Sequence, residues 1–441
     1  MQLPQQVEEE CCKSKMNGYF FKVSDKKWQL DKSICVFPVE VVKNLSPDFQ
    51  FGYINTLAYF AKNFSAGYVK TVNVVFSKFF STGKFEVIDD ESVLRFKARL
   101  NEKEIYCLCY MKSFLQKWLS FNYPGVHSSS VEIFNKIRIE RGRVGEAIKR
   151  RDPNHGPFTE EELNMIVVRT NQLLTDKKID LALFCFLQLL IHTGRRPLQL
   201  TSLKNIDLKK NEHVAVIKIP RVKQKLSFRE SFSENIIGDK LYDLLVTLKK
   251  QTVEILKVKF ETVLDNSIIE MLPIFIDQKT VDSCKSISEL KSNLESDFLH
   301  AKNGHLKDQI NVMAKENHLV SERTGTVINL NPRRFRYTLG TNLAKNGASI
   351  SVIAKALDHS TISSAGIYIK NTADNVENID AHMNRFLEPL SKVFMGLEIE
   401  SNSKRFINSM RDAFGIKDEV PNEIKCFSCK QFNPWRGKIN D

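Results

Sequence analysis

The stretch that decides the fold is "LALFCFLQLLIHTGRRP", residues 181–197. Its beginning is apolar on all sides except at Gln188, which is typical of a helix at the centre of a domain. Gly194 is suited to end this helix, because glycine readily adopts the left-handed backbone of a helix C-cap. Two arginines follow, the second being Arg196, and Pro197 favours the first turn of a further helix. The stretch therefore predicts two helices with arginines at the turn between them.

A second group of arginines lies in "NPRRFRYTLG", residues 331–340, before an expected helix that ends near Gly347. Arg333, Arg334 and Arg336 stand here beside two aromatic residues. A guanidinium group is costly to take out of water, so such a cluster at the start of an apolar helix needs an anion to face. The sequence therefore predicts an anion-binding site at this helix.

A histidine and a tyrosine complete a set of groups suited to phosphate chemistry. His359 precedes a short expected helix, and Tyr368 follows nine residues later among small and apolar neighbours. Two fixed arginines such as Arg196 and Arg336 can hold the non-bridging oxygens of one phosphate by paired hydrogen bonds. A tyrosine hydroxyl beside them can be the nucleophile, because adjacent guanidinium groups lower the cost of its phenolate form.

The composition of the whole chain favours a folded protein with a polyanionic partner. The 441 residues allow two or three domains, and 65 Lys and Arg against 52 Asp and Glu give a formal charge of +13. That excess fits nucleic acid or an anionic membrane surface. The longest apolar run, 181–191, is about half of the ~20 residues that span a bilayer, and no signal segment is visible, so no membrane association is expected. Nine scattered cysteines favour reduced thiols in a cytoplasmic protein.

Hydrophobic spacing predicts two helical domains. Apolar residues recur at intervals of three and four over 66–82 and 102–121, which indicates a helical bundle. Thr159 and Glu162 have the spacing of a capping box, which predicts the first helix of a second domain. Residues 240–315 are expected to be mostly helical.

The expected fold class is mainly α with a small antiparallel β-sheet, an α+β arrangement. The sheet comes from a hairpin at 213–232 with Pro220 in its turn, and a short strand is expected at 325–330. The chain is divided into an N-terminal segment of unassigned role (1–50), a helical domain (51–140), a basic linker (141–158), a second domain (159–375) and a C-terminal helix and tail (376–441). The linker's basic residues are either a solvated connector or a track along a phosphate backbone.

Three segments, in this order, resemble the catalytic domain of tyrosine recombinases, also called phage-type integrases. They are "HTGRRPLQLTSLKNIDL" (192–208), the hairpin, and "RRFRYTLGTNLAKNGASISVIAKALDHSTISSAGIY" (333–368). The resemblance covers residues 155–375, and the helical unit at 51–138 is similar to the family's core-binding domain in kind and position. The order of arginine, hairpin lysine, second arginine, histidine and tyrosine makes the resemblance specific.

The resemblance implies a role for each site residue. Arg196 and Arg336 correspond to the family's two arginines, which bind the scissile phosphate. His359 would hydrogen-bond the same phosphate, and Tyr368 would be the nucleophile. Lys223, in the turn of the hairpin, would be the general acid that protonates the leaving 5′-oxygen. It is chosen in preference to Lys218 and Lys225.

Two positions depart from the family's usual pattern. Arg333 stands three residues before Arg336, where the family normally has histidine. Arginine cannot accept a proton, so Arg333 is expected to be a third electrostatic contact to the phosphate. The proton of Tyr368 would then pass to water, to a phosphate oxygen or to His359. Asp358 stands where the family usually has glycine, and it can pair with one of these arginines.

The activity implied by the resemblance is site-specific recombination of double-stranded DNA through a 3′-phosphotyrosine intermediate, serving the integration, excision or transposition of a mobile element. The covalent link conserves the phosphodiester energy, so neither a metal nor another cofactor is expected. The resemblance also implies a homo-tetramer on two DNA sites. Two alternatives stay open: a DNA-relaxing enzyme similar to type IB topoisomerases, and a DNA-binding accessory protein without catalysis, which the missing histidine at position 333 would suit.

Two further features lie near the C-terminus. The apolar stripe of residues 381–396 is expected either to dock on a neighbouring protomer or to pack on its own domain. Cys426 and Cys429 have the spacing of zinc ligands. A closed zinc site needs four ligands and no second pair follows, so two free thiols are the competing interpretation.

Overall fold

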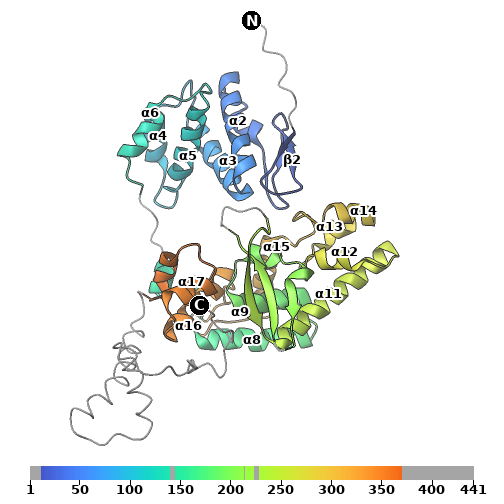
Figure 1. Cartoon of the computed structure of the whole chain (residues 1–441). Coiled ribbons are helices and arrows are strands. Elements are labelled where there is room, and N and C mark those ends of the chain that lie inside the picture. The colour runs from blue at the N-terminus through green and yellow to red at the C-terminus, as the bar shows by residue number, and fades with distance from the viewer. Residues whose placement is uncertain (1–10, 140–144, 213, 223–227, 370–441) are drawn as a thin grey trace, which may run out of the picture.

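The computed structural model describes residues 11–139, 145–212, 214–222 and 228–369. These residues form two helical units (Figure 1), an N-terminal one up to residue 139 and a C-terminal one from residue 145, with separate hydrophobic cores. Helices dominate both units, and the sheets are small and antiparallel. The predicted fold class is therefore confirmed. In this described part of the chain, no helix is long and apolar enough to cross a membrane.

The N-terminal unit is a helical bundle with an aromatic core. Its helices are α1 (Pro38–Val42), α2 (Pro47–Asn63), α3 (Ala66–Phe80), α4 (Asp90–Arg99), α5 (Cys107–Ser120) and α6 (Ser129–Lys136). Two antiparallel pairs precede them: β1 (Cys11–Lys13) with β2 (Phe20–Lys22), and β3 (Trp28–Gln29) with β4 (Cys35–Val36). Helix α2 begins before the predicted residue 51, because the Ser46 side chain caps it and Pro47 suits its first turn.

The C-terminal unit is built around α9 (Leu181–Thr193). This helix packs against α8 (Glu160–Thr175), α10 (Pro197–Thr201), α11 (Asp239–Phe260), α15 (Asn303–Glu316) and α16 (Pro332–Lys345). Every residue from Leu183 to Leu190 is buried, which confirms the predicted central helix. Gly194 ends it in the left-handed region, with φ at +55°.

The remaining elements of this unit are short. They are the helices α7 (Glu146–Lys149), α12 (Asn266–Met271), α13 (Gln278–Ser283), α14 (Ile287–Ser292), α17 (Ile350–Ala356) and α18 (Gly366–Ile369), and the 3-10 turns η1 (Asn205–Asp207) and η2 (Ile362–Ala365). An antiparallel sheet has the strand order β5-β6-β7, with β5 (Leu208–Lys210), β6 (Ala215–Pro220) and β7 (Phe232–Ile237).

Two strand predictions are wrong in detail. The hairpin's second strand is Phe232–Ile237 and not a segment before 232. Arg229, with φ at +58°, donates to both carboxylate oxygens of Asp207 at 2.6 and 2.8 Å. These contacts hold the chain around Arg229 against η1, so the pairing with β6 begins only at Phe232, opposite Pro220. The stretch 325–330 forms an isolated bridge between Val327 and Val320 and no strand. Beyond the bridge, the Leu330 N–H donates to the Asn311 side chain and not to a strand partner.

The predicted linker, 141–158, is partly a piece of the C-terminal unit. Residues 141–144 lie outside the described residues, but from Gly145 onward the chain packs on this unit. Ile148 and Phe158 are buried in two of its cores. The Gly156 carbonyl accepts a hydrogen bond from Nε of Arg334 at 2.9 Å. The unit therefore starts before the predicted residue 159.

Helix α8 starts at the predicted capping box, and its Glu162 fixes α16 as well. Thr159 and Glu162 exchange both capping hydrogen bonds. The Glu162 carboxylate is buried and accepts hydrogen bonds from Arg323 at 2.6 Å and from Arg334 at 3.1 Å. The guanidinium of Arg334 also stacks over the Phe158 ring, 3.9 Å from its centre. The anion that Arg334 faces is thus the protein's own Glu162.

The N-terminal segment, whose role the sequence leaves unassigned, joins the two units. Lys32 extends to the C-terminal unit, where its ammonium donates to the carbonyls of Phe298, at 2.6 Å, and of His300 and pairs with Asp277 at 3.1 Å. Gly18 lies against Ser296, so close that an added Cβ would be 2.7 Å from the Cβ of that serine. Figure 1 shows this segment above α13 and α14.

Replacing Lys32 by alanine is expected to loosen the two units from each other. The change leaves the Asp277 carboxylate and two carbonyls without their buried cation, which removes about 3 kcal/mol of the free energy that holds the units together. Small-angle X-ray scattering should record a larger radius of gyration. Lys43→Ala is the matched control, because Lys43 pairs with Glu40 at an exposed site and its loss should leave the radius unchanged. An unchanged radius in Lys32→Ala would contradict this assignment.

Replacing Glu162 by glutamine is expected to destabilise the C-terminal unit by about 3 kcal/mol, because Arg334 stays buried without its counter-ion. Burial raises the pKa of Glu162, but hydrogen bonds from Arg323 and Ser321 outweigh that effect and leave this pKa below its usual value. The charged form therefore stabilises the fold above the ordinary carboxyl pKa of 4.5, and that contribution is lost as the pH falls. Denaturant unfolding at pH 7 and pH 3 should show the stability difference between wild type and variant shrinking in acid.

Candidate active site

The end of α9 and the first turns of α16 meet at Gly194. The Gly194 carbonyl accepts a hydrogen bond from Nη1 of Arg336 at 3.1 Å. A Cβ at Gly194 would lie 3.0–3.3 Å from atoms of Leu339, Leu357 and the Arg336 backbone, and its φ of +55° favours glycine independently. This close approach brings the turn that carries Arg196 against the helix that carries Arg336.

Arg336 is buried and keeps hydrogen-bonding capacity. Its side chain is 8% exposed, and its Nη2 is buried without an acceptor among the described residues. Burial, followed by the charges of Arg196 and Arg195, lowers its pKa to about 10, so it stays protonated at neutral pH. A buried donor of this kind needs an acceptor, and an anion supplies the strongest one.

Arg196 lies at the start of α10, half-buried. Its backbone N–H donates to the side-chain oxygen of Gln199 at 3.2 Å, and its Nη1 lies 3.4 Å from the carbonyl oxygen of Asp358, to which it donates. Burial lowers the pKa of Arg196, while Asp358 and Tyr368 act in the opposite direction. The cation is therefore held between α10 and the turn that precedes His359.

His359 is held by the end of α17 and is neutral at physiological pH. The backbone N–H of His359 donates to the Ala354 carbonyl at 2.9 Å, and this hydrogen bond caps the C-terminal end of α17. Burial, then the charges of Arg336 and Arg196, lower the pKa of His359 to about 4. Its Nδ1 is buried without a partner among the described residues. A neutral imidazole in this position can accept a proton or donate to a phosphate oxygen.

Tyr368 is packed into the same site from α18. It is 1% exposed, and its ring lies on Gly340 of α16, where an added Cβ would come within 2.6–2.8 Å of three ring atoms. Its ring centre is 6.2 Å from that of His359 and 6.4 Å from that of Tyr337. Burial raises the pKa of Tyr368 to about 12, while Arg336 and Arg196 act to lower it. The described conformation therefore keeps this side chain as a phenol.

Arg195 and Asp358 are buried side by side, and Arg221, which is one-third exposed, binds the same carboxylate. The family resemblance singles out Asp358 but neither of these arginines. Arg195 is 1% exposed and donates to Asn235 at 3.0 Å. The Asp358 carboxylate accepts from Arg221 at 2.6 Å and lies 3.7 Å from Nη1 of Arg195. Asp358 was expected to pair with Arg196, Arg333 or Arg336, and its carboxylate pairs with two other arginines. The position of Arg195 directly after a buried helix is the sequence feature that could have indicated its burial.

Arg333, unlike its neighbours Arg334 and Arg336, is exposed to solvent. The Arg333 side chain is exposed at the first turn of α16, where the backbone N–H donates to the capping Asn331 at 3.0 Å. It is three residues before Arg336 and shares its helix face. Its role as a phosphate contact stays a prediction. Lys223 lies outside the described residues, as do the stripe at 381–396 and the cysteines 426 and 429.

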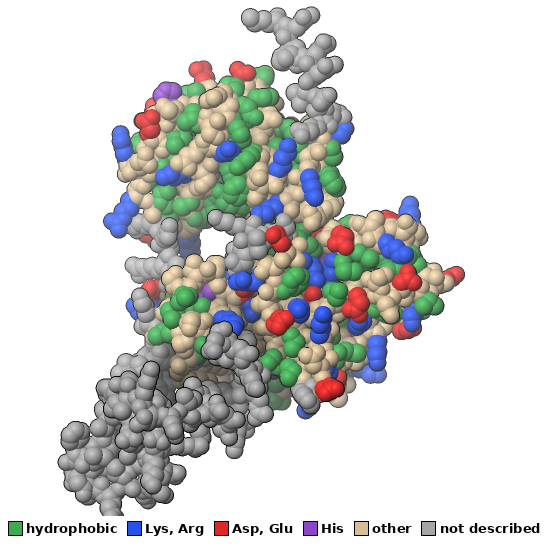
Figure 2. All heavy atoms as spheres, in the orientation of Figure 1, with side chains coloured by type: hydrophobic (Ala, Val, Ile, Leu, Met, Phe, Trp, Pro, Cys, Tyr) green, Lys and Arg blue, Asp and Glu red, His purple; other side chains and the backbone are tan. Residues whose placement is uncertain are grey.

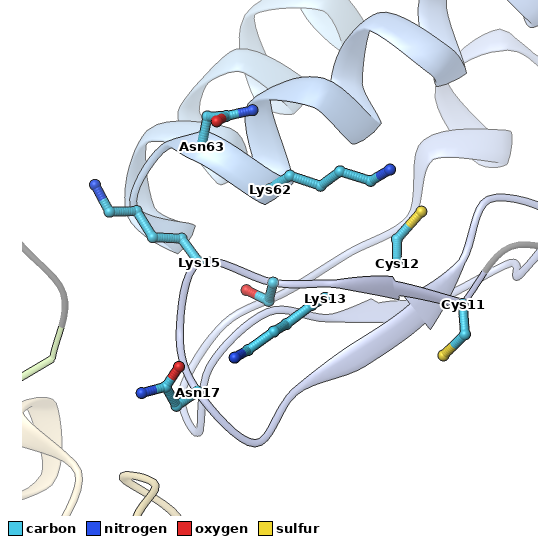
Figure 3. Close-up of a pocket in the computed structure, with 8 residues that line it drawn as sticks. Cys11, Cys12, Lys13, Lys15, Asn17, Lys62 and Asn63 are labelled. Carbon is cyan, nitrogen blue, oxygen red and sulfur yellow. The ribbon is translucent and has the colours of Figure 1, made fainter.

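A basic cavity lies on the N-terminal unit beside the junction of the two units. Its volume is about 550 Å³, and Figure 3 shows Lys13 and Lys15 on the β1 side and Lys62 at the end of α2. Asn17 and Asn63 also line it, and none of the described lining residues is acidic. Figure 2 shows an opening between the two units. Three lysines around one cavity suit an anionic partner.

One family of known proteins matches most of the C-terminal unit. The Phage integrase family matches residues 157–375, which contain Arg196, Arg336, His359 and Tyr368. The tyrosine recombinase XerC of Oceanobacillus iheyensis is 29% identical over 92 residues, which cover 21% of this chain and 30% of that protein. The matched part thus spans less than a third of this relative's length.

The solved structures that match this chain include recombinases bound to DNA. The XerH site-specific recombinase in a post-cleavage complex with palindromic difH substrate is 15% identical, with 78% of this chain and 87% of that chain covered and a TM-score of 0.48. A lambda integrase dimer bound to a COC′ core site is 11% identical, with 75% and 79% covered and a TM-score of 0.44. With the family match over residues 157–375, the chain belongs to the phage integrase family, the tyrosine recombinases.

Proposed function

We propose that this protein is a site-specific DNA recombinase that cleaves and rejoins strands through a 3′-phosphotyrosine intermediate. The observation that carries the proposal is the mutual proximity of four side chains from separate segments. The charges of Arg196 and Arg336 act on the pKa values of both His359 and Tyr368. Two guanidinium groups, a neutral imidazole and a phenol near one another are the groups that a phosphodiester cleavage through tyrosine requires.

In the proposed reaction, the DNA phosphate occupies the space between the two arginines. Arg336 supplies its unpaired Nη2 and Arg196 its outer guanidinium edge, and both stabilise the charge that develops on the non-bridging oxygens. The Tyr368 oxygen attacks phosphorus and the bond to the 5′-oxygen breaks. Lys223 donates the proton that the leaving oxygen needs. A 5′-hydroxyl of the partner duplex then attacks the phosphotyrosine and restores the phenol.

The proton of Tyr368 needs an acceptor before or during attack, because the phenol has a pKa of about 12. His359 is a candidate acceptor, since its pKa of about 4 leaves it neutral at pH 7. A bound phosphate would offset the charges of Arg336 and Arg196, and so would raise the proton affinity of His359. Water and a phosphate oxygen are the other acceptors. Arg333 acts in this scheme as an electrostatic contact and never as a base.

The proposed partner is double-stranded DNA, held between the two units. The formal charge of +13, the lysine-lined cavity and the opening in Figure 2 support this placement. The two DNA sites of a recombination event would engage four protomers. The proposed role is the integration, excision or transposition of a mobile element in the cytoplasm, without a metal or other cofactor.

A suicide DNA substrate, nicked so that the cleaved strand diffuses away, tests this proposal. Wild type should form a covalent protein–DNA adduct visible by denaturing electrophoresis, and Tyr368→Phe should form none. Arg336→Ala should slow adduct formation by about 100-fold or more, because one fixed donor to the developing charge is lost. A wild type that binds the DNA without forming an adduct contradicts the enzymatic proposal and favours the accessory DNA-binding alternative.

Arg333→His tests the residue that stands in the family's histidine position. If Arg333 contacts the phosphate as a cation, the variant should form the adduct about tenfold more slowly at pH 8, where histidine is neutral. Relative to wild type, it should recover at pH 5.5, where histidine is charged. Arg333→Lys keeps the cation and serves as the control. A rate ratio that does not change with pH would make Arg333 peripheral.

A further inference from the structure

Asp358 occupies a backbone position that favours glycine. It follows α17 directly after Leu357, with φ at +52°. Its N–H donates to the Lys355 carbonyl at 3.1 Å, and the N–H of His359 donates to Ala354 at 2.9 Å. These two bonds form the helix-ending motif whose left-handed residue is usually glycine or asparagine. An aspartate stays in this less favoured conformation only where contacts of its side chain offset the cost.

The Asp358 side chain supplies that reason, because it is buried among donors. The carboxylate is 2% exposed. Its Oδ1 accepts from Nε of Arg221 at 2.6 Å. Its Oδ2 accepts from the side-chain amide of Gln199 at 2.9 Å and lies 3.7 Å from Nη1 of Arg195. One carboxylate therefore offsets two arginines that would otherwise repel each other at short range.

These contacts extend to Arg196 by two routes. Gln199 donates to Asp358 with its amide nitrogen and accepts from the Arg196 backbone N–H with its oxygen, at 3.2 Å. The Asp358 carbonyl accepts from Nη1 of Arg196 at 3.4 Å. His359 is the next residue in the chain, so the contacts that hold Asp358 also hold the backbone from which the His359 side chain extends. Arg196 and His359 are the groups that the proposed function assigns to one phosphate.

We propose that Asp358 is a positioning residue, which holds Arg196 and His359 in register for the same phosphate without touching the DNA itself. The inference rests on the proposed function. Its physical basis is that a fixed donor stabilises a developing charge only at the correct distance, and a displacement of about 1 Å can reduce the rate 100-fold. The carboxylate sets that distance by binding Gln199 and by neutralising Arg195 and Arg221.

Asp358→Asn is the informative variant. Asparagine tolerates the left-handed backbone and is nearly the same size, so the turn is retained. Its amide has one oxygen for the two donors Gln199 and Arg221, so in either orientation one of them faces the NH2 group, and its neutral group would leave Arg195 without a counter-ion. Single-turnover adduct formation on the suicide substrate should slow by about 10- to 100-fold, while the Kd for duplex DNA stays within about twofold.

Two companion variants separate positioning from general stability. Glu162→Gln removes a buried carboxylate that binds Arg323 and Arg334 and none of the groups around Asp358, and it is the control for loss of stability. Adding Gln199→Glu to Asp358→Asn reverses the hydrogen bond, since the asparagine amide can donate to the new carboxylate, and returns one negative charge to the cluster. This double variant should regain adduct formation by about tenfold over Asp358→Asn.

The outcomes distinguish this inference from the proposed function. If wild type forms the adduct and Asp358→Asn slows it no more than Glu162→Gln does, the positioning role is wrong and the enzymatic function stands. If wild type forms no adduct, both are wrong. If Asp358→Asn does not fold, Arg221→Gln, whose side chain is one-third exposed, removes one partner of the carboxylate, and a rate equal to that of wild type would overturn the inference.

Discussion

A guanidinium group taken out of water must find acceptors, and this constraint shapes the C-terminal unit. Arg195, Arg334 and Arg336 are each less than a tenth exposed. Arg334 is satisfied by Glu162, and Arg195 lies beside Asp358. Arg336 donates to one backbone carbonyl and keeps a second buried nitrogen without an acceptor in the described part of the chain. Nε and Nη1 of Arg195 are also buried without a hydrogen-bond partner there, so Asp358 offsets the charge of Arg195 without accepting from these two atoms. At the candidate active site, a bound phosphate would supply the acceptor that Arg336 lacks.

The same burial sets the protonation states of Tyr368 and His359. Tyr368 is a phenol with a pKa of about 12, and His359 is neutral because burial and two arginines disfavour its cation. Under the proposed function, the substrate phosphate changes this balance. Its charge offsets Arg336 and Arg196, so His359 gains proton affinity in the presence of DNA. The proposed chemistry is thereby coupled to substrate binding.

Local sequence signals predict the helices that build the site and fail where contacts are distant. The apolar run around α9, the glycine after it and the capping box at Thr159 act over a few residues, and each is confirmed. The partner of Asp358 was not predictable, because Arg221 is 137 positions away and is brought near by the fold. Lys32 and Asp277 are likewise far apart in the sequence, so composition could not predict that the N-terminal segment contacts the C-terminal unit. The hairpin's second strand was misplaced because Arg229 binds Asp207.

Peptide mapping of the trapped protein–DNA complex tests the central claim most directly. After nuclease and trypsin digestion, mass spectrometry identifies the residue that keeps a covalent nucleotide. Cleavage after Lys355 and Lys370 releases residues 356–370, which contain Tyr368 as their single tyrosine. The account predicts a 3′-linked nucleotide on this peptide, at Tyr368. A nucleotide on another residue, or on the 5′ side of the break, would contradict it.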